Sequence, residues 1–120
     1  MTQEEFILLV EKVLDALPQE IHRKLDNLAV VVEDLPVGQM PPEEGTGKAL
    51  VMGAFMGVPL TARGAGEKPY FYGPDRIVLF QKNIEAVCDS EIEIRREIRQ
   101  TLLHELGHYF GMSEEQLSDV

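Results

Sequence analysis

The sequence predicts an α+β fold, because patterns typical of helices and patterns typical of strands occupy separate segments. Apolar residues recur at helical spacing near both ends of the chain, over residues 3–17 and 91–110. Between these ends, short apolar and β-branched runs are bounded by glycine, proline or asparagine, as strands are. The chain has 120 residues, 44% of them apolar, so we expect one domain, residues 1–120, with a modest core.

The first helix is expected over residues 3–17. Thr2 and Glu5 have the spacing of a capping box, in which each side chain accepts a hydrogen bond from the backbone of the other residue. Pro18 ends this helix, and it can also open a second helix over residues 18–26, because proline is favoured in a first turn.

Three strands are expected, over residues 28–33, 49–56 and 76–81. The first is a β-branched run that we expect to lie buried in the centre of the sheet. The second contains Gly53, which weakens a strand, so a short helix is the alternative interpretation there. Residues 82–88, which follow the third strand, are expected to form one or two helical turns.

The last helix is expected over residues 91–110, where Ser90 and Glu93 form a second capping-box pattern. At 1.5 Å per residue such a helix is about 30 Å long, which makes it a rigid support for side chains. Its core stripe comprises Ile94, Ile98, Leu102, Leu106 and Phe110. The stripe leaves Arg95, Arg96 and Arg99 toward solvent or toward neighbouring acidic groups.

This helix carries the motif H-E-x-x-H, with His104 and His108 enclosing Glu105. Side chains four residues apart project from one face of a helix, so both imidazoles can bind a single zinc ion. Glu105 lies about 100° further round the helix, which keeps its carboxylate off the metal. In that position it can act as general base toward a zinc-activated water.

A catalytic zinc needs a third protein ligand. Gly111 can end the helix and turn the chain back toward the metal, because glycine tolerates a positive φ. Glu114 then occupies the place of the last histidine in the metzincin pattern, so it is the predicted third ligand. Glu115 is adjacent and remains the alternative.

The net charge of −10 argues against nucleic acid or an anionic membrane as partner. No apolar run is long enough to span a membrane, and the acidic N-terminal residues are unlike a signal peptide. Cys88 is the single cysteine, so no intramolecular disulfide is possible and a reducing compartment fits. We therefore expect a cytoplasmic protein.

The chain resembles the zincin-like metallopeptidases, a family of small bacterial H-E-x-x-H proteins. The similar segments are residues 28–34 (LAVVVED), 57–61 (GVPLT), 63–64 (RG), 74–77 (PDRI) and 104–115 (HELGHYFGMSEE). The resemblance implies a minimal zincin-like domain, with a small mixed sheet packed on helices and an edge strand beside the H-E-x-x-H helix near the C-terminus. It also implies one Zn²⁺ held by His104 and His108. Family members often have histidine in place of Tyr109, so no role is transferred to that position.

These patterns predict a zinc metallopeptidase that acts on peptide or protein substrates. The alternative is a metal-binding or regulatory module without efficient proteolysis, because a domain this small has little chain to build a deep substrate cleft. Glu105 favours the enzyme, since a binding module needs no general base there. Tyr109, Tyr70 and Tyr72 are candidates for stabilising the oxyanion, and spacing does not choose among them.

Overall fold

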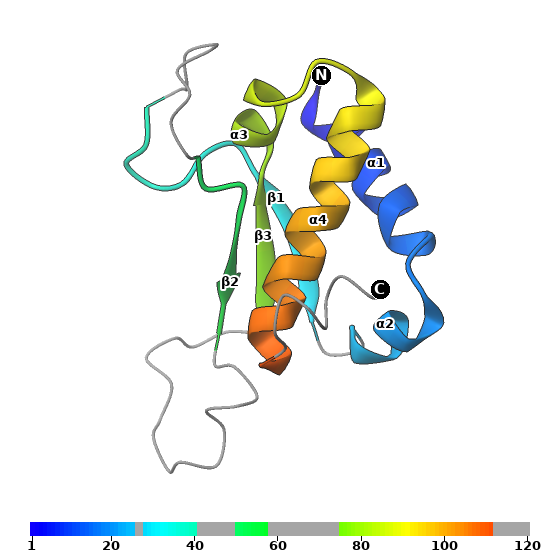
Figure 1. The fold of residues 1–120 in the computed structure, drawn as a ribbon. Helices are drawn as coiled ribbons and strands as arrows, with labels where there is room; N and C mark the ends of the chain where they lie inside the picture. The colour runs from blue at the N-terminus through cyan, green and yellow to red at the C-terminus, as the bar shows by residue number, and fades with distance from the viewer. Residues whose placement is uncertain (26–27, 41–49, 58–74, 112–120) are drawn as a thin grey trace.

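The structure is a computed structural model that describes residues 1–25, 28–40, 50–57 and 75–111 (Figure 1). In chain order they form α1 (Gln3–Asp15), α2 (Gln19–Lys24), β1 (Ala29–Glu33), β2 (Gly53–Met56), β3 (Arg76–Phe80), α3 (Gln81–Ala86) and α4 (Glu91–Phe110). Helices and strands thus combine in one small sheet-and-helix architecture, which confirms the predicted α+β class. None of the described helices is long and apolar enough to cross a membrane.

The sheet has the order β1-β3-β2, with β1 parallel and β2 antiparallel to β3. It is therefore mixed, as the family resemblance implies. The expectation that residues 28–33 form the central strand is wrong, since β3 lies between the other two described strands. A β-branched run is compatible with a central strand and with an edge strand. The two strands differ in burial: β3 is buried from Ile77 to Phe80, whereas β1 is only half-buried and its ends are exposed.

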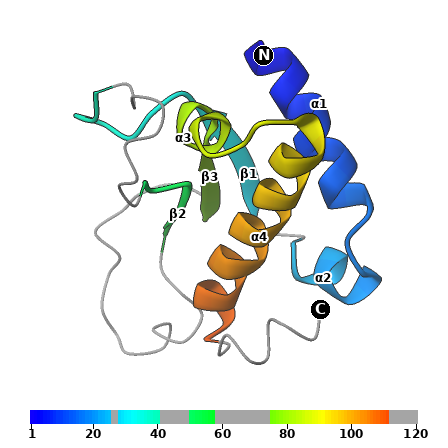
Figure 2. The ribbon, with the colours of Figure 1, turned by 45° about the horizontal axis from the view of Figure 1, so that its top comes forward.

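Helices α1 and α4 cover the same face of the sheet (Figures 1 and 2). Their apolar stripes meet the inward side chains of β3 in one core, whose fully buried members include Phe6, Ile77, Leu79, Ile98 and Leu102. The predicted capping box of α1 is present, because Thr2 and Glu5 bind one another's backbone. The helix ends at Asp15, two residues before the predicted end.

Strand β2 is shorter than the predicted 49–56, and the alternative of a short helix there is wrong. Val51, two residues before the strand, is bound by a side chain instead of by the ladder. The buried Asn83 donates from Nδ2 to the carbonyl of Val51 at 2.8 Å and exchanges hydrogen bonds with Gln39. Met52 still accepts a bond from the Phe80 N–H, so regular pairing begins there.

Gly53 begins β2 at the point where this strand approaches α4. A Cβ atom at this position would lie 2.6 Å from Cγ2 of Thr101 and 3.0 Å from the carbonyl oxygen of Val78. Only glycine fits such a close approach without displacing its neighbours. The glycine that weakens the strand pattern is therefore what lets β2 lie against the helix.

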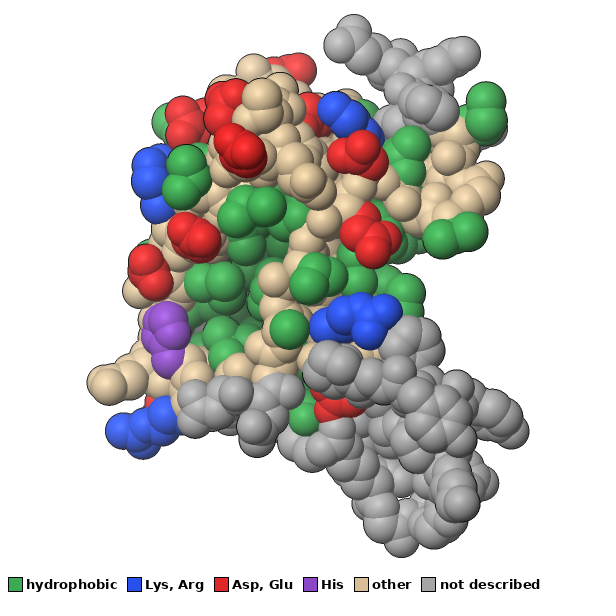
Figure 3. Space-filling model, turned by 180° about the vertical axis from the view of Figure 1, so that it is seen from behind, with side chains coloured by type: hydrophobic (Ala, Val, Ile, Leu, Met, Phe, Trp, Pro, Cys, Tyr) green, Lys and Arg blue, Asp and Glu red, His purple; other side chains and the backbone are tan. Residues whose placement is uncertain are grey.

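The opposite face of the sheet carries the alternate side chains, because successive residues of a strand point to opposite faces. Val31, Ala54 and Val78 belong to this face, and Val78 is buried there. Seen from behind, hydrophobic side chains gather over the middle of the molecule, with acidic side chains around them (Figure 3).

Candidate metal centre

The helix that carries the motif is defined at both ends by side-chain and glycine signals. Ser90 Oγ accepts the Glu93 N–H at 3.2 Å, while the Glu93 carboxylate accepts the Asp89 N–H at 2.6 Å. In a capping box the Glu93 carboxylate would accept the N–H of the N-cap residue, Ser90. Here it accepts the N–H of Asp89, one residue earlier. Gly111 adopts a left-handed conformation (φ 68°, ψ 27°) and ends the helix. The predicted bounds, 91–110, are those observed.

The two histidines of the motif lie side by side on an exposed face of α4. Their Nε2 atoms are 3.0 Å apart, and their rings meet edge to face with centroids 4.5 Å apart. Two nitrogens that bind one tetrahedral zinc at 2.0–2.1 Å are about 3.3 Å from each other. The pair therefore fits a shared zinc ion with a small adjustment of the side chains.

Glu105 lies between the two histidines in sequence but turns inward and is half-buried. Burial raises the pKa of its carboxyl above the ordinary value. The positive charges of His108 and His104, when protonated, and a hydrogen bond from the Phe55 N–H act in the opposite direction. A carboxylate with a raised pKa is a stronger proton acceptor, which is the property that a general base needs.

Strand β2 presents backbone groups beside this carboxylate. The Phe80 to Met52 hydrogen bond fixes the ladder, so that Ala54 and Met56 bond to β3, whereas Gly53 and Phe55 are non-bonded partners of Leu79 and Ile77. The peptide groups of Gly53 and Phe55 therefore point away from β3. Among the described strands, β2 is an edge strand, as the resemblance implies.

Tyr109 is buried and turned toward the strand ends. Its hydroxyl donates to Asp75 Oδ2 at 3.4 Å, and its ring lies 5.0 Å from that of Phe55. Asp75 also lies against Gly57, where a Cβ atom would collide with its carboxylate. This arrangement binds α4 to the ends of β2 and β3, and it directs the Tyr109 hydroxyl to a protein acceptor. Of the other oxyanion candidates, Tyr70 and Tyr72 lie outside the described residues.

The predicted third ligand, Glu114, and its alternative, Glu115, also lie outside the described residues. Within the ranges that the structure describes, no group of three or more histidine, cysteine or acidic side chains could hold a metal ion. The described portion of the centre is thus the histidine pair with Glu105. Among the described residues, Phe55 contacts Glu105 and Asp75 contacts Tyr109, and sequence analysis did not assign either of them to the site.

The comparisons with known proteins agree with this fold. The sequence profile of a family described as zincin-like metallopeptidase matches residues 25–120. A solved structure, of a conserved hypothetical protein from Thermo thermophilus, has a TM-score of 0.53 and 24% sequence identity, over 98% of each chain. This likeness concerns the fold. The search of curated proteins finds no significant match.

Proposed function

Because the chain belongs to the zincin-like metallopeptidase family, we propose that it hydrolyses peptide bonds in peptide or protein substrates. One observation carries this proposal: two exposed imidazole nitrogens lie 3.0 Å apart on α4, and the residue between them in the motif is a half-buried glutamate.

His104 and His108 would hold one Zn²⁺ through their Nε2 atoms, with Glu114 as the proposed third ligand and Glu115 as the alternative. When bound, zinc supplies Lewis acidity, which polarises the scissile carbonyl and makes a water a nucleophile near neutral pH. The histidines must be neutral to bind the metal, so metal affinity should fall as they become protonated.

Glu105 is the proposed general base. Its carboxylate would accept a proton from the attacking water and then deliver that proton to the leaving amine. Two features of its surroundings support this role. Partial burial raises the pKa of the carboxyl, and the hydrogen bond from the Phe55 N–H orients it.

The substrate would bind as an extended strand along the edge of β2 that does not pair with β3. The peptide groups of Gly53 and Phe55 face away from β3, toward the side where an added strand would lie, and of these groups the Phe55 N–H already donates to Glu105. A substrate bound there would compete with Glu105 for the Phe55 N–H. Recognition by main-chain hydrogen bonds selects extended, unfolded segments more than particular side chains.

The test compares wild-type protein with Glu105→Gln, both loaded with Zn²⁺, against a library of fluorescence-quenched peptides. Metal content is measured in parallel. We expect equal zinc in both proteins and hydrolysis by wild type only. If zinc is bound and neither protein cleaves any peptide, the alternative holds, namely a metal-binding or regulatory module.

A further inference from the structure

Residues 34–40, which follow β1, extend past β2 on the side away from β3 (Figures 1 and 2). They do so at the end of the sheet where β2 begins. A substrate bound along the edge of β2 that does not pair with β3 would lie on the same side. The segment is therefore placed where it can contact the part of a substrate that continues beyond β2.

Hydrogen bonds fix the shape of this segment. Residues 36–39 form a β-turn, in which the Gln39 N–H donates to the Pro36 carbonyl at 3.1 Å. Gly38 has a positive φ of 83°, as the third residue of a type II turn has. The Gln39 side chain exchanges two hydrogen bonds with the fully buried Asn83, at 2.7 and 3.0 Å. Because buried hydrogen bonds are costly to break, this pair holds the segment in one position.

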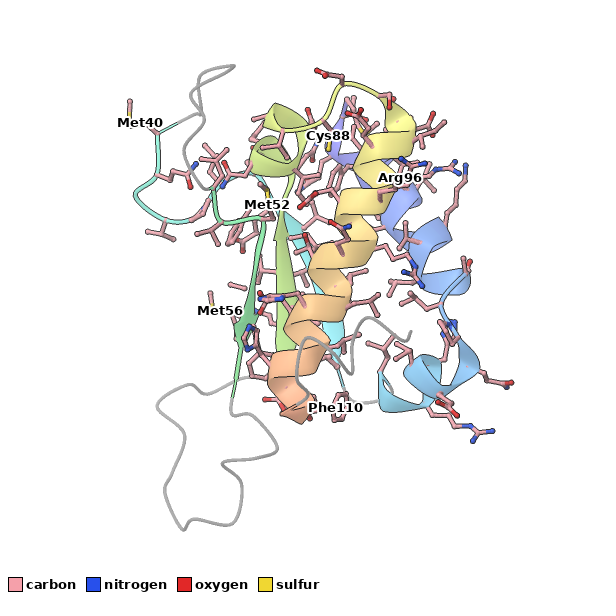
Figure 4. All side chains as sticks on the ribbon, in the orientation of Figure 1. Met40, Met52, Met56, Cys88, Arg96 and Phe110 are labelled. Carbon is pink, nitrogen blue, oxygen red and sulfur yellow. The ribbon has the colours of Figure 1, made fainter. Side chains whose placement is uncertain are left out.

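The segment presents apolar side chains to solvent. Val37 is fully exposed, and Met40 is 79% exposed. Met40 lies at the outer end of the segment, farther from β3 than Met52 is (Figure 4). Val51, which is 53% exposed, is tied to the same anchor, since its carbonyl accepts a hydrogen bond from Asn83 at 2.8 Å. Single apolar residues are common on protein surfaces, whereas these three are held together by one buried side chain.

We infer that this apolar patch, Val37, Met40 and Val51, binds an apolar side chain of the peptide substrate, away from the bond that is cleaved. The inference rests on the proposed function and adds a substrate class to it. Val51 precedes Phe55 by four residues, which is about 13 Å along a strand at 3.3 Å per residue. The preferred substrate is therefore an extended segment with an apolar residue about four positions from the residue that lies opposite Phe55.

The patch would add a selection that the edge of β2 does not provide. Main-chain hydrogen bonds along a strand recognise an extended backbone whatever its side chains are. Methionine is flexible and polarizable, so Met40 can adapt to apolar side chains of different shapes. The patch would thus favour unfolded segments that carry a large aliphatic or aromatic residue.

Fluorescence anisotropy of two labelled, capped peptides tests the inference. Both peptides are long enough to span β2 and the patch. One carries leucines near each end of a serine–threonine sequence, so that either strand direction brings a leucine to the patch, and the other has serine in place of each leucine. Binding is measured with the full chain in the presence of a chelator, so that the result does not depend on hydrolysis. We expect saturable binding of the leucine peptide and a Kd about tenfold higher for the serine peptide, in line with the burial of one leucine.

The double variant Val37→Ser/Met40→Ser should raise the Kd of the leucine peptide about tenfold and leave that of the serine peptide unchanged. Both side chains are exposed, so the variant should fold, and an unchanged midpoint of urea unfolding verifies this. Leu8→Ser is the matched control, because Leu8 is 57% exposed on α1 and does not belong to the patch. It should leave both Kd values unchanged.

Three results would overturn the inference. The first is equal binding of the two peptides, or binding of neither. The second is a Kd of the leucine peptide that the double variant leaves unchanged, or that Leu8→Ser raises equally. The third is a dimer in sedimentation that the double variant dissociates, without binding of the leucine peptide, which would assign the patch to a second copy of the chain.

A failure of the proposed function gives a different result. If zinc-loaded wild type cleaves neither peptide while metal-free protein still prefers the leucine peptide, the chain binds peptides at the patch without being a peptidase. If zinc-loaded wild type cleaves both peptides and the metal-free protein shows no preference for leucine, the peptidase stands and the inference about the patch is wrong.

Discussion

Gly53→Ala tests how closely β2 must lie against α4. In a strand without steric conflict, replacing glycine by alanine stabilises a protein, by about 0.4–1 kcal/mol, because the unfolded chain loses freedom. Here the new Cβ would lie 2.6 Å from Cγ2 of Thr101 and 3.0 Å from the Val78 carbonyl oxygen. Both neighbours are buried, so the clash cannot be relieved by moving into solvent. Overpacking of this kind costs about 1–3 kcal/mol, which reverses the sign.

Urea unfolding measures this change. For a domain of this size the slope is about 1–3 kcal/mol per molar, so a loss of about 2 kcal/mol lowers the midpoint by roughly 1 M. Thr101→Ser removes the clashing methyl group and alone costs about 1 kcal/mol. In the double variant Gly53→Ala/Thr101→Ser, the new Cβ atom of residue 53 no longer clashes with a Cγ2 atom of residue 101. The loss of stability should therefore be smaller than the sum of the losses in the two single variants. We expect a favourable coupling of about 1 kcal/mol.

The reasoning is refuted if Gly53→Ala is neutral or stabilising, or if the two changes are additive. An unchanged slope in each variant serves as the check that all of them unfold from the same compact state.

Three further predictions concern the candidate centre. His104→Ala or His108→Ala should abolish zinc binding, whereas Glu105→Gln should keep the zinc and lose hydrolysis; unchanged zinc content in both histidine variants contradicts the assignment. Glu114→Ala should weaken zinc affinity at least about tenfold and Glu115→Ala little, and chelator titrations that rank them otherwise exclude Glu114 as the third ligand. In metal-free protein, the raised pKa of Glu105 means that its contribution to stability is present below pH 4.5 and is lost as the pH rises through the folded-state pKa. Glu105→Gln removes this pH-dependent loss of stability. The free energy of unfolding of the variant, relative to that of wild type, should therefore increase with pH, and a difference that stays constant with pH would contradict the raised pKa of Glu105.

Helix α4 could be predicted to the residue because its signals are local. Ser90 satisfies a backbone donor at one end, and Gly111 takes the left-handed conformation at the other. The motif spacing then places both histidines on one face by helix geometry alone. Local rules of this kind need no knowledge of the rest of the fold.

The order of the strands and the surroundings of Glu105 could not be predicted in the same way. A valine-rich run is compatible with a central or an edge strand, and the choice depends on which strands pair across the chain. The contact of Phe55 with Tyr109 likewise depends on the β2–β3 register, in which Phe55 is opposite Ile77. The register of two strands is set by long-range packing, so it cannot be inferred from the residue pattern of either strand alone.

The candidate centre combines residues of β2 and α4, two elements that are far apart in the sequence. Helix α4 alone sets the spacing of the histidine nitrogens, because they lie one turn apart on a rigid support. Glu105 depends on both elements, since it projects from α4 and accepts the N–H of Phe55 in β2. A change that shifts β2 away from α4 should therefore disturb the base and the substrate edge while it leaves the histidine pair intact. The close approach at Gly53 and the Tyr109 contacts hold that distance, which explains why residues without metal-binding chemistry belong to the site.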